Sequence, residues 1–368
     1  MPQADAIPPD IVCAEDYERH ARNRLDPAIW AYVNGAGTDG ITARANSAAW
    51  SRIRLQGRAL ADMRGADMAL DLVGLTLPHP LILAPVACHG LAHPGGEGAT
   101  RIGAAATGSL MVVSCEAGQE IEAIAAAATG PLWLQLYLQP SRDDTLILVR
   151  KAEAAGYHAL VLTVDAPISG LRNEEQRAGF QMPPHLSAVN LQGFRRPEIR
   201  QMPGRGPAFL GLMDEAPRWE DVVWLKSRTR LPILLKGIMN SADAVRAVEC
   251  GADGIIVSNH GGRVLDTLPS TAEALPAIAK AVTGRIPILC DGGIRRGTDA
   301  LKALALGARA VLIGQPQIHA LAVGGSSGIA HLMALLRHEL EVAMVLTGNR
   351  TLADISLDSI WPSDRPTT

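Results

Sequence analysis

The segment that decides the fold is residues 232–262, PILLKGIMNSADAVRAVECGADGIIVSNHGG. It starts with a short apolar run, Pro232 to Gly237, and ends with a second one, Gly254 to Asn259. Between them, Ala242 to Cys250 has the spacing of an amphipathic helix, and Ser241 is placed to be its N-cap. A strand, a helix and a second strand in this order predict one unit of a parallel sheet.

The same alternation continues on both sides of this segment, from residue 81 onward. Eight apolar runs have the length of strands: Leu81 to Pro85, Ser109 to Ser114, Leu132 to Tyr137, Ala159 to Asp165, Pro232 to Gly237, Gly254 to Asn259, Pro287 to Gly293 and Ala310 to Gly314. Further helical patterns lie at Glu120 to Ala128, Asp143 to Ala155 and Asp299 to Leu306, and left-handed C-caps are expected at Gly156, Gly251, Gly284 and Gly307. Eight such units in series predict an α/β fold, a closed (β/α)8 TIM barrel.

The N-terminal extension, residues 1–80, precedes the alternation. Its pattern predicts helices around Ala14 to Val33 and Thr42 to Trp50, followed by short strands near Ile53 and Leu70. We expect this extension to cover the bottom or the side of the barrel, and the whole chain, 1–368, to be one domain.

A second departure from the alternation is residues 166–231, between strands four and five. Its middle is rich in Pro, Gly and Arg, from Arg195 to Pro207. Connections of this length are usually functional or mobile, so we expect a lid with a poorly ordered tip. A passive surface loop is the alternative.

Composition narrows the class of protein. The chain is 48% apolar, enough for a large core, and its formal net charge of -3 comes with no block of like charges. These features predict no nucleic-acid partner and no membrane partner. No uninterrupted apolar stretch approaches the length of a spanning helix, and residues 1–10 lack a basic start followed by an apolar run. We therefore expect a soluble, cytoplasmic protein.

The cysteines point to the same compartment. There are five, scattered along the chain and without a metal-ligand spacing. This pattern suits a reducing environment and predicts neither structural disulfides nor a metal site.

Polar residues collect at the carboxyl ends of the predicted strands, where barrel enzymes place their active sites. In strand order these residues are Ala84 to Ala87, Ser114, Gln135 with Tyr137, Thr163 with Asp165, Lys236, Ser258 to Arg263, Asp291 to Gly293, and Gly314 with Gln315. One polar strand end would mean little, but a set distributed over eight strands predicts a site.

Glycines and arginines within this set predict a phosphate site. Gly261-Gly262, Gly292-Gly293 and Gly314 allow backbone N–H groups to approach an anion, and Arg295 and Arg296 add charge. Barrels commonly bind phosphate after strands seven and eight, so a phosphorylated cofactor is expected. Ordinary turns would explain the glycines but not the arginines. No G-x-G-x-x-G follows a first strand, which argues against a nicotinamide domain.

The candidate catalytic groups are a base, its partner and three cations. His260 can take a proton near neutral pH, and Asp165 can orient its imidazole. Arg172 and Arg263 can bind a substrate carboxylate bidentately. Lys236, at the end of a buried strand, needs an anion, which a reduced cofactor would supply. Structural ion pairing among these residues is the alternative.

At these residues the sequence resembles the FMN-dependent 2-hydroxy-acid oxidase and dehydrogenase family, which includes glycolate oxidase, lactate oxidase and mandelate dehydrogenase. The resemblance extends from about Tyr17 to Ile360. It is most specific at SNHGGR with LD (258–263, 265–266) and at DGGIRRG (291–297). The segments APVACHGLAH (84–93) and LAVGGSSG (321–328) look most like lactate oxidase and 4-hydroxymandelate oxidase.

The resemblance implies roles for individual residues. His260 would be the base and Asp165 its partner, Arg263, Arg172 and Tyr32 would bind the substrate carboxylate, and Tyr137 would bind the substrate oxygen. Lys236 would lie at the flavin N1 edge. The residues lining the FMN would be Pro85, Val86, Ala87, Ser114, Gln135, Thr163, Ser258, Asp291, Gly292, Gly293, Arg295, Gly314 and Gln315. The family also implies a homo-oligomer, a tetramer or an octamer.

Two positions depart from the family pattern. Gln315 stands where relatives usually have arginine, so we expect weaker FMN binding, tightened by Gln315→Arg. Glu116 stands where relatives often present an aromatic ring to the substrate. We expect Glu116 either to bind a polar donor on the substrate side chain or to turn away toward a surface arginine.

The resemblance implies oxidation of an (S)-2-hydroxy acid to the 2-keto acid, with O2 as acceptor and hydrogen peroxide as product. One alternative is a dehydrogenase that passes electrons to a quinone or a protein. An alternative of another class is a flavin-binding protein with weak or lost catalysis, which Gln315 and Glu116 would favour.

Overall fold

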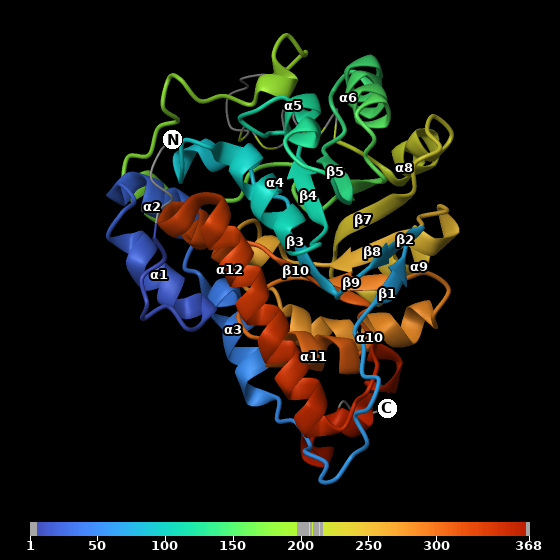
Figure 1. The fold of residues 1–368 in the computed structure, drawn as a ribbon. Helices are drawn as coiled ribbons and strands as arrows, with labels where there is room; N and C mark the ends of the chain where they lie inside the picture. The colour runs from blue at the N-terminus through green and yellow to red at the C-terminus, as the bar shows by residue number, and fades with distance from the viewer. Residues whose placement is uncertain (1–5, 197–205, 207, 209–212, 214–215, 366–368) are drawn as a thin grey trace.

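Eight parallel strands close into a barrel in this computed structural model, which describes residues 6–196, 206, 208, 213 and 216–365 (Figure 1). The strands are β3 (Leu81–Leu83), β4 (Met111–Ser114), β5 (Leu132–Leu136), β6 (Ala159–Thr163), β7 (Ile233–Ile238), β8 (Gly254–Val257), β9 (Ile288–Cys290) and β10 (Ala310–Ile313). Each strand pairs with its neighbours in sequence, and β10 pairs with β3 to close the ring. The predicted (β/α)8 barrel is confirmed, and all eight predicted strands are present.

Helices follow the strands and surround the barrel. They are α4 (Gly96–Ala106), α5 (Ile121–Ala126), α6 (Arg142–Ala154), α8 (Trp219–Lys226), α9 (Ser241–Glu249), α10 (Thr271–Val282), α11 (Gly297–Ala305) and α12 (Gln315–Thr347). All four predicted C-cap glycines have positive φ, from +72° to +110°.

The predicted N-cap of α9 is wrong by one residue. Asn240 caps the helix, because its Oδ1 accepts the Asp243 N–H at 2.9 Å. Ser241 is the first helical residue, and its hydroxyl donates to the Ala277 carbonyl at 3.1 Å.

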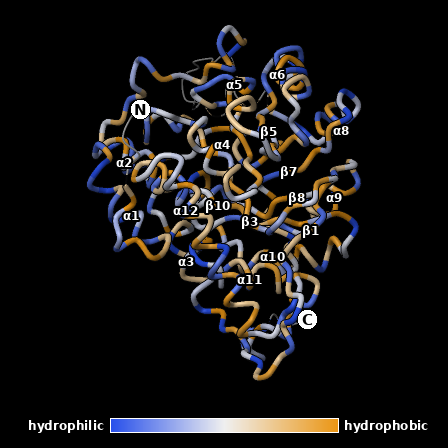
Figure 2. The backbone as a smooth tube through the Cα atoms, viewed as in Figure 1, coloured by the Kyte–Doolittle hydropathy of each residue, from blue (hydrophilic) through white to orange (hydrophobic). Residues whose placement is uncertain are grey.

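The barrel interior is filled by alternate strand residues, which are hydrophobic along most of each strand (Figure 2). At the carboxyl end of several strands, the same alternation makes a polar residue point into the barrel. Val161 is part of the interior cluster, and Thr163, two residues later, lines the cavity at the barrel mouth. The same two-residue step joins Val112 to Ser114, Trp133 to Gln135, Leu234 to Lys236, Ile256 to Ser258 and Leu289 to Asp291. One layer of the barrel is therefore polar.

The N-terminal helices lie against the carboxyl ends of the strands and the side of the barrel. They are α1 (Ala14–Arg22), α2 (Pro27–Asn34) and α3 (Ile41–Arg52). The single helix predicted over Ala14 to Val33 is broken, because Pro27 starts a new helix that Asp26 caps. Trp50 of α3 donates from Nε1 to the Gly292 carbonyl at 2.8 Å, which joins α3 to the loop after β9.

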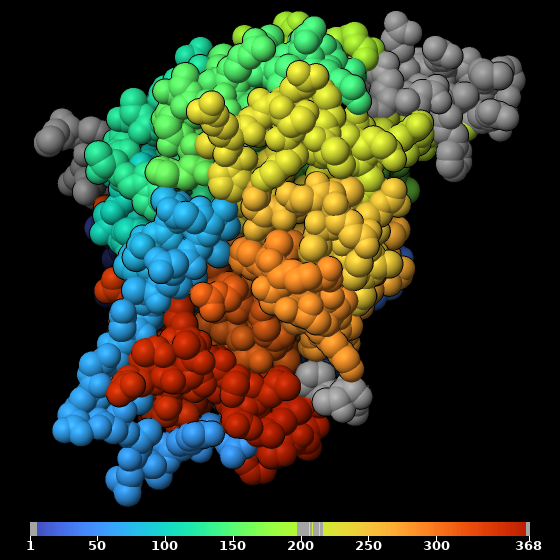
Figure 3. All heavy atoms as spheres, turned by 90° about the vertical axis from the view of Figure 1, so that its right-hand side faces the viewer, coloured from blue at the N-terminus to red at the C-terminus, as the bar shows by residue number. Residues whose placement is uncertain are grey.

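A hairpin closes the opposite end of the barrel. Its strands β1 (Leu70–Leu72) and β2 (Leu75–Leu77) are antiparallel, and Leu70, Leu72 and Leu77 belong to the interior cluster. In the space-filling view the light-blue segment that contains the hairpin lies across this end of the molecule (Figure 3). The extension thus covers the bottom and the side, as predicted, and its helices also cover part of the face at the carboxyl ends of the strands, which was not predicted. The strand predicted near Ile53 is wrong, since only one isolated bridge, Leu55 to Ile360, forms there.

The insert between β6 and β7 contains α7 (Asn173–Arg177) and the short 3-10 helix Val189–Leu191. Most of its predicted tip, residues 197–205 and 207, lies outside the described residues. The prediction of a poorly ordered tip therefore stays a prediction.

Helix α12 is, within the described ranges, the one helix long and apolar enough to cross a membrane by length and composition. The expectation from the sequence concerned an uninterrupted apolar stretch, and α12 is interrupted by polar residues such as His319, Ser326 and His331. In addition, 67% of its most apolar window is buried inside the protein, and the helix packs on α4, α1 and α11. It also kinks at Gly324 and Gly325. These contacts identify α12 as a core helix.

Asp266 ties the N-terminal extension to the loop after β8. Its carboxylate is buried and accepts the N–H groups of Asp39, Ile41 and Thr42, at 3.1, 3.2 and 2.8 Å, and the Thr38 hydroxyl at 3.0 Å. It thereby caps α3, whose own N-cap residue is Gly40 without a side chain. Burial raises the pKa of Asp266, but the backbone N–H groups of Thr42 and Ile41 outweigh this effect and lower the pKa well below its ordinary value.

We expect Asp266→Asn to lower the free energy of unfolding by about 1–3 kcal/mol at pH 7, because an amide leaves several N–H donors of the cap unsatisfied. Folding depresses the pKa of Asp266, so its stabilisation is complete above about pH 4 and is lost as the pH falls through the folded pKa. Urea unfolding at pH 7 and in acid measures both effects, with the exposed Asp143→Asn as the control. An unchanged stability at pH 7 would contradict the capping role.

Candidate active site

A cavity of about 590 Å³ opens at the carboxyl ends of the strands. This volume lies within the range of small-molecule sites, roughly 300–1,000 Å³. Most of the residues that the sequence predicted for the site line this cavity; Asp165, Ser258, Asn259, Gly262 and Arg296 do not. Asp165 contacts His260, and Ser258 contacts both Lys236 and His260. The structure therefore brings the predicted residues together.

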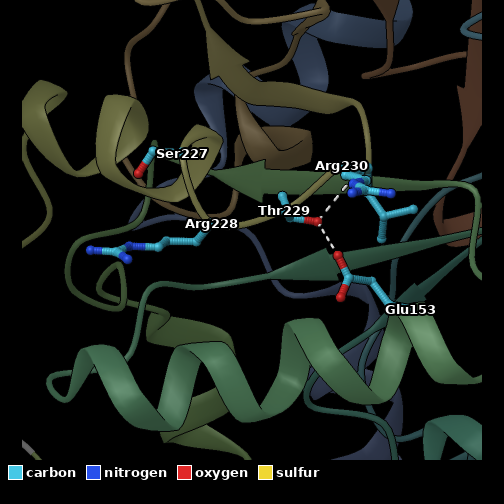
Figure 4. A pocket seen from close by; sticks show the side chains of 6 residues that line it. Glu153, Ser227, Arg228, Thr229 and Arg230 are labelled. Atoms are coloured by element: carbon cyan, nitrogen blue, oxygen red, sulfur yellow. Dashed lines mark hydrogen bonds between the residues drawn. The ribbon is translucent and has the colours of Figure 1, made fainter.

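A second depression lies near the opposite end of the barrel, just before β7 (Figure 4). It is lined by Glu153, Ser227, Arg228, Thr229, Arg230 and Leu231. The Thr229 hydroxyl donates to Glu153 and accepts from the Leu231 N–H. We assign no function to it.

His260 and Asp165 form a hydrogen-bonded pair. The turn after β8 holds His260 at φ +57°, with its N–H donating to Ser258 Oγ at 3.1 Å. Its Nδ1 lies 3.0 Å from Asp165 Oδ1. Asp165 comes this close to β7 because position 237 is glycine, where a Cβ would lie 2.5 Å from the Asp165 carboxyl carbon.

The charge on Asp165 decides which nitrogen of the His260 ring is the basic one. Burial raises the pKa of Asp165, but the His260 hydrogen bond and the Lys236 charge outweigh burial, so the pKa falls below its ordinary value. An ionised Asp165 accepts a proton from Nδ1 and assigns the tautomer. Among the described residues Nε2 has no partner, and the ring lines the cavity. His260 is therefore positioned to accept a proton from a bound molecule.

Lys236 already has an anion within the protein. Its Nζ lies 3.2 Å from Asp291 Oδ2 and donates to Ser258 Oγ at 2.9 Å. The expectation that a cofactor must supply its counter-charge was wrong. Burial lowers the pKa of Lys236, but the charge of Asp291 outweighs burial and keeps the pKa above its ordinary value. An ammonium has three donors, so one remains for a ligand acceptor.

Arg263 and Arg172 meet at the same side of the cavity. Arg263 donates through Nη1 to the Val33 and Gly35 carbonyls and through Nη2 to the Tyr32 carbonyl. Burial, followed by the charge of Arg172, lowers the pKa of Arg263 to about 10. Three of its five N–H groups thus bind backbone carbonyls of α2 and of Gly35, which follows it. The Nε–H and one Nη2–H remain and form a pair of donors for a carboxylate.

Arg172 is partly available. Its Nη1 lies 3.1 Å from Glu175 Oε2, whereas its Nε is buried without a partner in the described part of the chain. Two cations with free donors at one place suit a carboxylate.

Tyr32 and Tyr137 line the cavity, as predicted. The Tyr32 ring stacks on Phe180 of the insert at a centroid distance of 4.4 Å. Burial raises the pKa of both phenols, so both keep their proton and donate hydrogen bonds at neutral pH. The insert therefore contributes Arg172 to the lining of the cavity and supports the Tyr32 ring through Phe180.

A chain of polar side chains crosses the mouth of the barrel. Ser114 Oγ donates to Gln135 Oε1 at 3.0 Å, and Gln135 Nε2 donates to Thr163 Oγ1 at 3.0 Å. At the other end of the cavity lie Gly292, Gly293 and Arg295. Arg296 does not contribute charge there, contrary to the prediction, because its Nη1 pairs with Glu339 at 3.0 Å.

Gln315 positions Arg295. Its Oε1 accepts from Arg295 Nη2 at 2.6 Å, and its Nε2 donates to Asn34 Oδ1 at 2.9 Å. His319 Nε2 lies 2.9 Å from the same Asn34 oxygen. Gln315 therefore replaces a cation with a hydrogen-bonded link between α2, α12 and Arg295.

We expect Gln315→Leu to weaken FMN binding by about tenfold, because Arg295 loses an acceptor worth roughly 1 kcal/mol and with it the orientation of its guanidinium. Gln315→Arg exchanges this hydrogen bond for a charge, and the expectation that it tightens FMN binding stays a prediction. Fluorescence of released flavin on dilution measures both affinities. Equal affinity of wild type and Gln315→Leu would show that Gln315 does not support Arg295.

Several cavity residues were missed by sequence reasoning. Asn34 and Asn46 come from the N-terminal helices, and Cys88 and Leu91 follow β3. Asn46 exchanges two hydrogen bonds with Asn259, at 2.9 and 2.8 Å. No spacing in the sequence marks these residues, because their partners are distant along the chain.

Comparison with known proteins gives consistent results. The profile of the family described as FMN-dependent dehydrogenase matches residues 21–362. An L-lactate oxidase of Alicycliphilus denitrificans is 46% identical over 364 residues, 99% of this chain and 100% of that protein. A peroxisomal (S)-2-hydroxy-acid oxidase of Oryza sativa subsp. japonica is 42% identical over 348 residues, 94% of each chain. A crystal structure of mandelate oxidase with (S)-2-phenylpropionate superposes with a TM-score of 0.86 at 37% identity, covering 95% of this chain and 98% of that one.

Proposed function

The chain belongs to the FMN-dependent dehydrogenase family, and from this premise we propose that it oxidises an (S)-2-hydroxy acid to the 2-keto acid with O2 as electron acceptor. The observation that carries the proposal is the His260–Asp165 pair, which faces the same cavity as Arg172 and Arg263. A base beside two cations matches a substrate with a hydroxyl next to a carboxylate.

The cavity suits FMN. Donors and acceptors from Gln135, Thr163 and Lys236 line one part, and Lys236 has a donor to spare. Arg295 and two glycines of positive φ line another part, which suits a phosphate. Lys236 would hold the polar edge of the flavin ring and Arg295 its phosphate. When bound, FMN accepts the two electrons of the substrate and passes them to O2, giving hydrogen peroxide.

The residues of the chain then have separate tasks. Arg172 and Arg263 bind the C1 carboxylate and thereby fix C2. Tyr137 donates a hydrogen bond to the substrate oxygen. His260 removes one proton through Nε2, and Asp165 stabilises the resulting imidazolium. The oxidation releases two electrons and two protons, of which His260 holds one.

The oxidase is favoured over the two alternatives. The relatives reported above are oxidases by name, which argues against a quinone or protein acceptor. A flavin-binding protein without catalysis would have no need for His260, Asp165, Arg172 and Arg263 around one cavity.

The test is anaerobic mixing of the flavin-loaded protein with (S)-2-hydroxy acids, followed by admission of air. We expect the flavin to bleach and then to recover with formation of hydrogen peroxide. No bleaching by any 2-hydroxy acid would reject the proposed function, whereas bleaching with slow recovery in air would favour the dehydrogenase.

We also propose a cytoplasmic homo-oligomer, a tetramer or an octamer. Five free cysteines support a reducing compartment. Cell fractionation and sedimentation of the purified protein test the two parts of this proposal.

A further inference from the structure

The Glu116 side chain lines the active-site cavity just after β4. Its backbone is fixed on both sides: the N–H donates to Ser114 Oγ at 3.1 Å, and the carbonyl accepts from Cys88 Sγ at 3.5 Å. Ser114 in turn is held by Gln135. The backbone of Glu116 is therefore held in place by residues at the end of β4 and after β3.

The Glu116 carboxylate has neither a hydrogen bond nor an ion pair with the residues described here. Burial raises its pKa above the ordinary value, and the charges of His260 and Arg172 offset part of this increase. Arg172 is already paired with Glu175. The sequence alternative, a surface arginine as the partner of Glu116, is therefore wrong.

An unpaired carboxylate that burial withdraws from water is costly unless a ligand satisfies it. If the proposed function is correct, Arg172 and Arg263 bind the C1 carboxylate of the substrate, and His260 contacts its C2 hydroxyl. The remaining substituent of C2, the side chain, is the part left to face Glu116. The nearby wall contributed by Cys88 and Leu91 has no charge to compete for the carboxylate.

We propose that Glu116 binds the substrate side chain and that the preferred substrate carries a hydrogen-bond donor beyond C2. This inference rests on the proposed function and adds the substrate class. A site built to pair with a donor rejects the analogue that lacks it, because the site's own polar group is then left unsatisfied.

The test uses pairs of acids with equal numbers of heavy atoms. The first pair is glycerate and 2-hydroxybutanoate, and the second is 2,4-dihydroxybutanoate and 2-hydroxypentanoate. All four are used with the (S) configuration at C2. We expect kcat/KM to favour the donor-bearing member of at least one pair by about tenfold or more in the wild type. In Glu116→Leu we expect the ratio to reverse, since the apolar side chain now matches the apolar wall.

Two further measurements keep the test independent of folding and of turnover. Glu116→Gln keeps the shape of the side chain and should reduce the ratio without reversing it, because the amide still accepts from a hydroxyl. Dissociation constants of hydroxypyruvate and 2-oxobutanoate, from the change in flavin absorbance, should show the same preference as turnover. The exposed Glu120→Leu is the control and should leave the ratio unchanged.

The outcomes separate the two proposals. If no acid bleaches the flavin, the proposed function fails. If the acids bleach it but the ratio is near one in the wild type, or is the same in Glu116→Leu, the function stands and the role of Glu116 is rejected.

Discussion

Replacing His260 by alanine is expected to slow reduction of the flavin by substrate by about 10²–10⁴-fold, the usual contribution of a positioned base. The His260 imidazole lines the cavity, and its Nε2 is free to accept a proton because its Nδ1 is held by Asp165 at 3.0 Å. FMN binding should be retained, since the His260 ring takes no part in the hydrogen bonds that join Ser114, Gln135 and Thr163. Anaerobic stopped-flow absorbance of the flavin measures the rate.

A matched control separates loss of the base from a general effect of removing a histidine. His185 is exposed in the insert, and His185→Ala should reduce the flavin at the wild-type rate. Flavin reduction should also be slow in Asp165→Asn. An asparagine NH2 group in the place of Oδ1 would donate to Nδ1 and so favour the tautomer of His260 that carries its proton on Nε2. A His260→Ala rate within a few-fold of wild type would show that another group accepts the proton.

The second large effect is expected on kcat/KM when Arg263 is replaced by lysine. We expect kcat/KM to fall by roughly 30-fold or more, although the charge is kept. This fall corresponds to a loss of about 2–5 kcal/mol in transition-state stabilisation. Arg263 supports three backbone carbonyls of α2 and its end and still has a fork for a carboxylate. Lysine has only three donors on one atom, so it cannot perform both tasks.

The loss should appear mainly as a higher KM, because substrate and transition state share the carboxylate contact. Binding of a 2-keto acid to the oxidised enzyme should weaken in parallel. Arg150→Lys, at an exposed position on α6, is the control. Unchanged kcat/KM in Arg263→Lys would assign the carboxylate to Arg172 alone.

The barrel and the position of the polar residues at its mouth follow from periodicity along the chain. Strand residues alternate between the two sides of a sheet, so a polar residue two positions after an inward Val or Leu must face the barrel mouth. This local rule places Thr163 after Val161 and Lys236 after Leu234. Gly251 and the other C-cap glycines follow equally local rules.

The partners of the charged groups, in contrast, depend on how distant parts of the chain pack together. Lys236 and Asp291, or Gln315 and Asn34, lie far apart along the chain and meet through the closure of the barrel and the docking of α2. The surroundings of Arg296 and Glu116 were undetermined for the same reason: Arg296 meets Glu339 of α12, whereas Glu116 meets an open cavity. Side-chain pairing depends on distances across the fold, which strand and helix periodicity do not specify, whereas the face on which a residue lies depends on that periodicity alone.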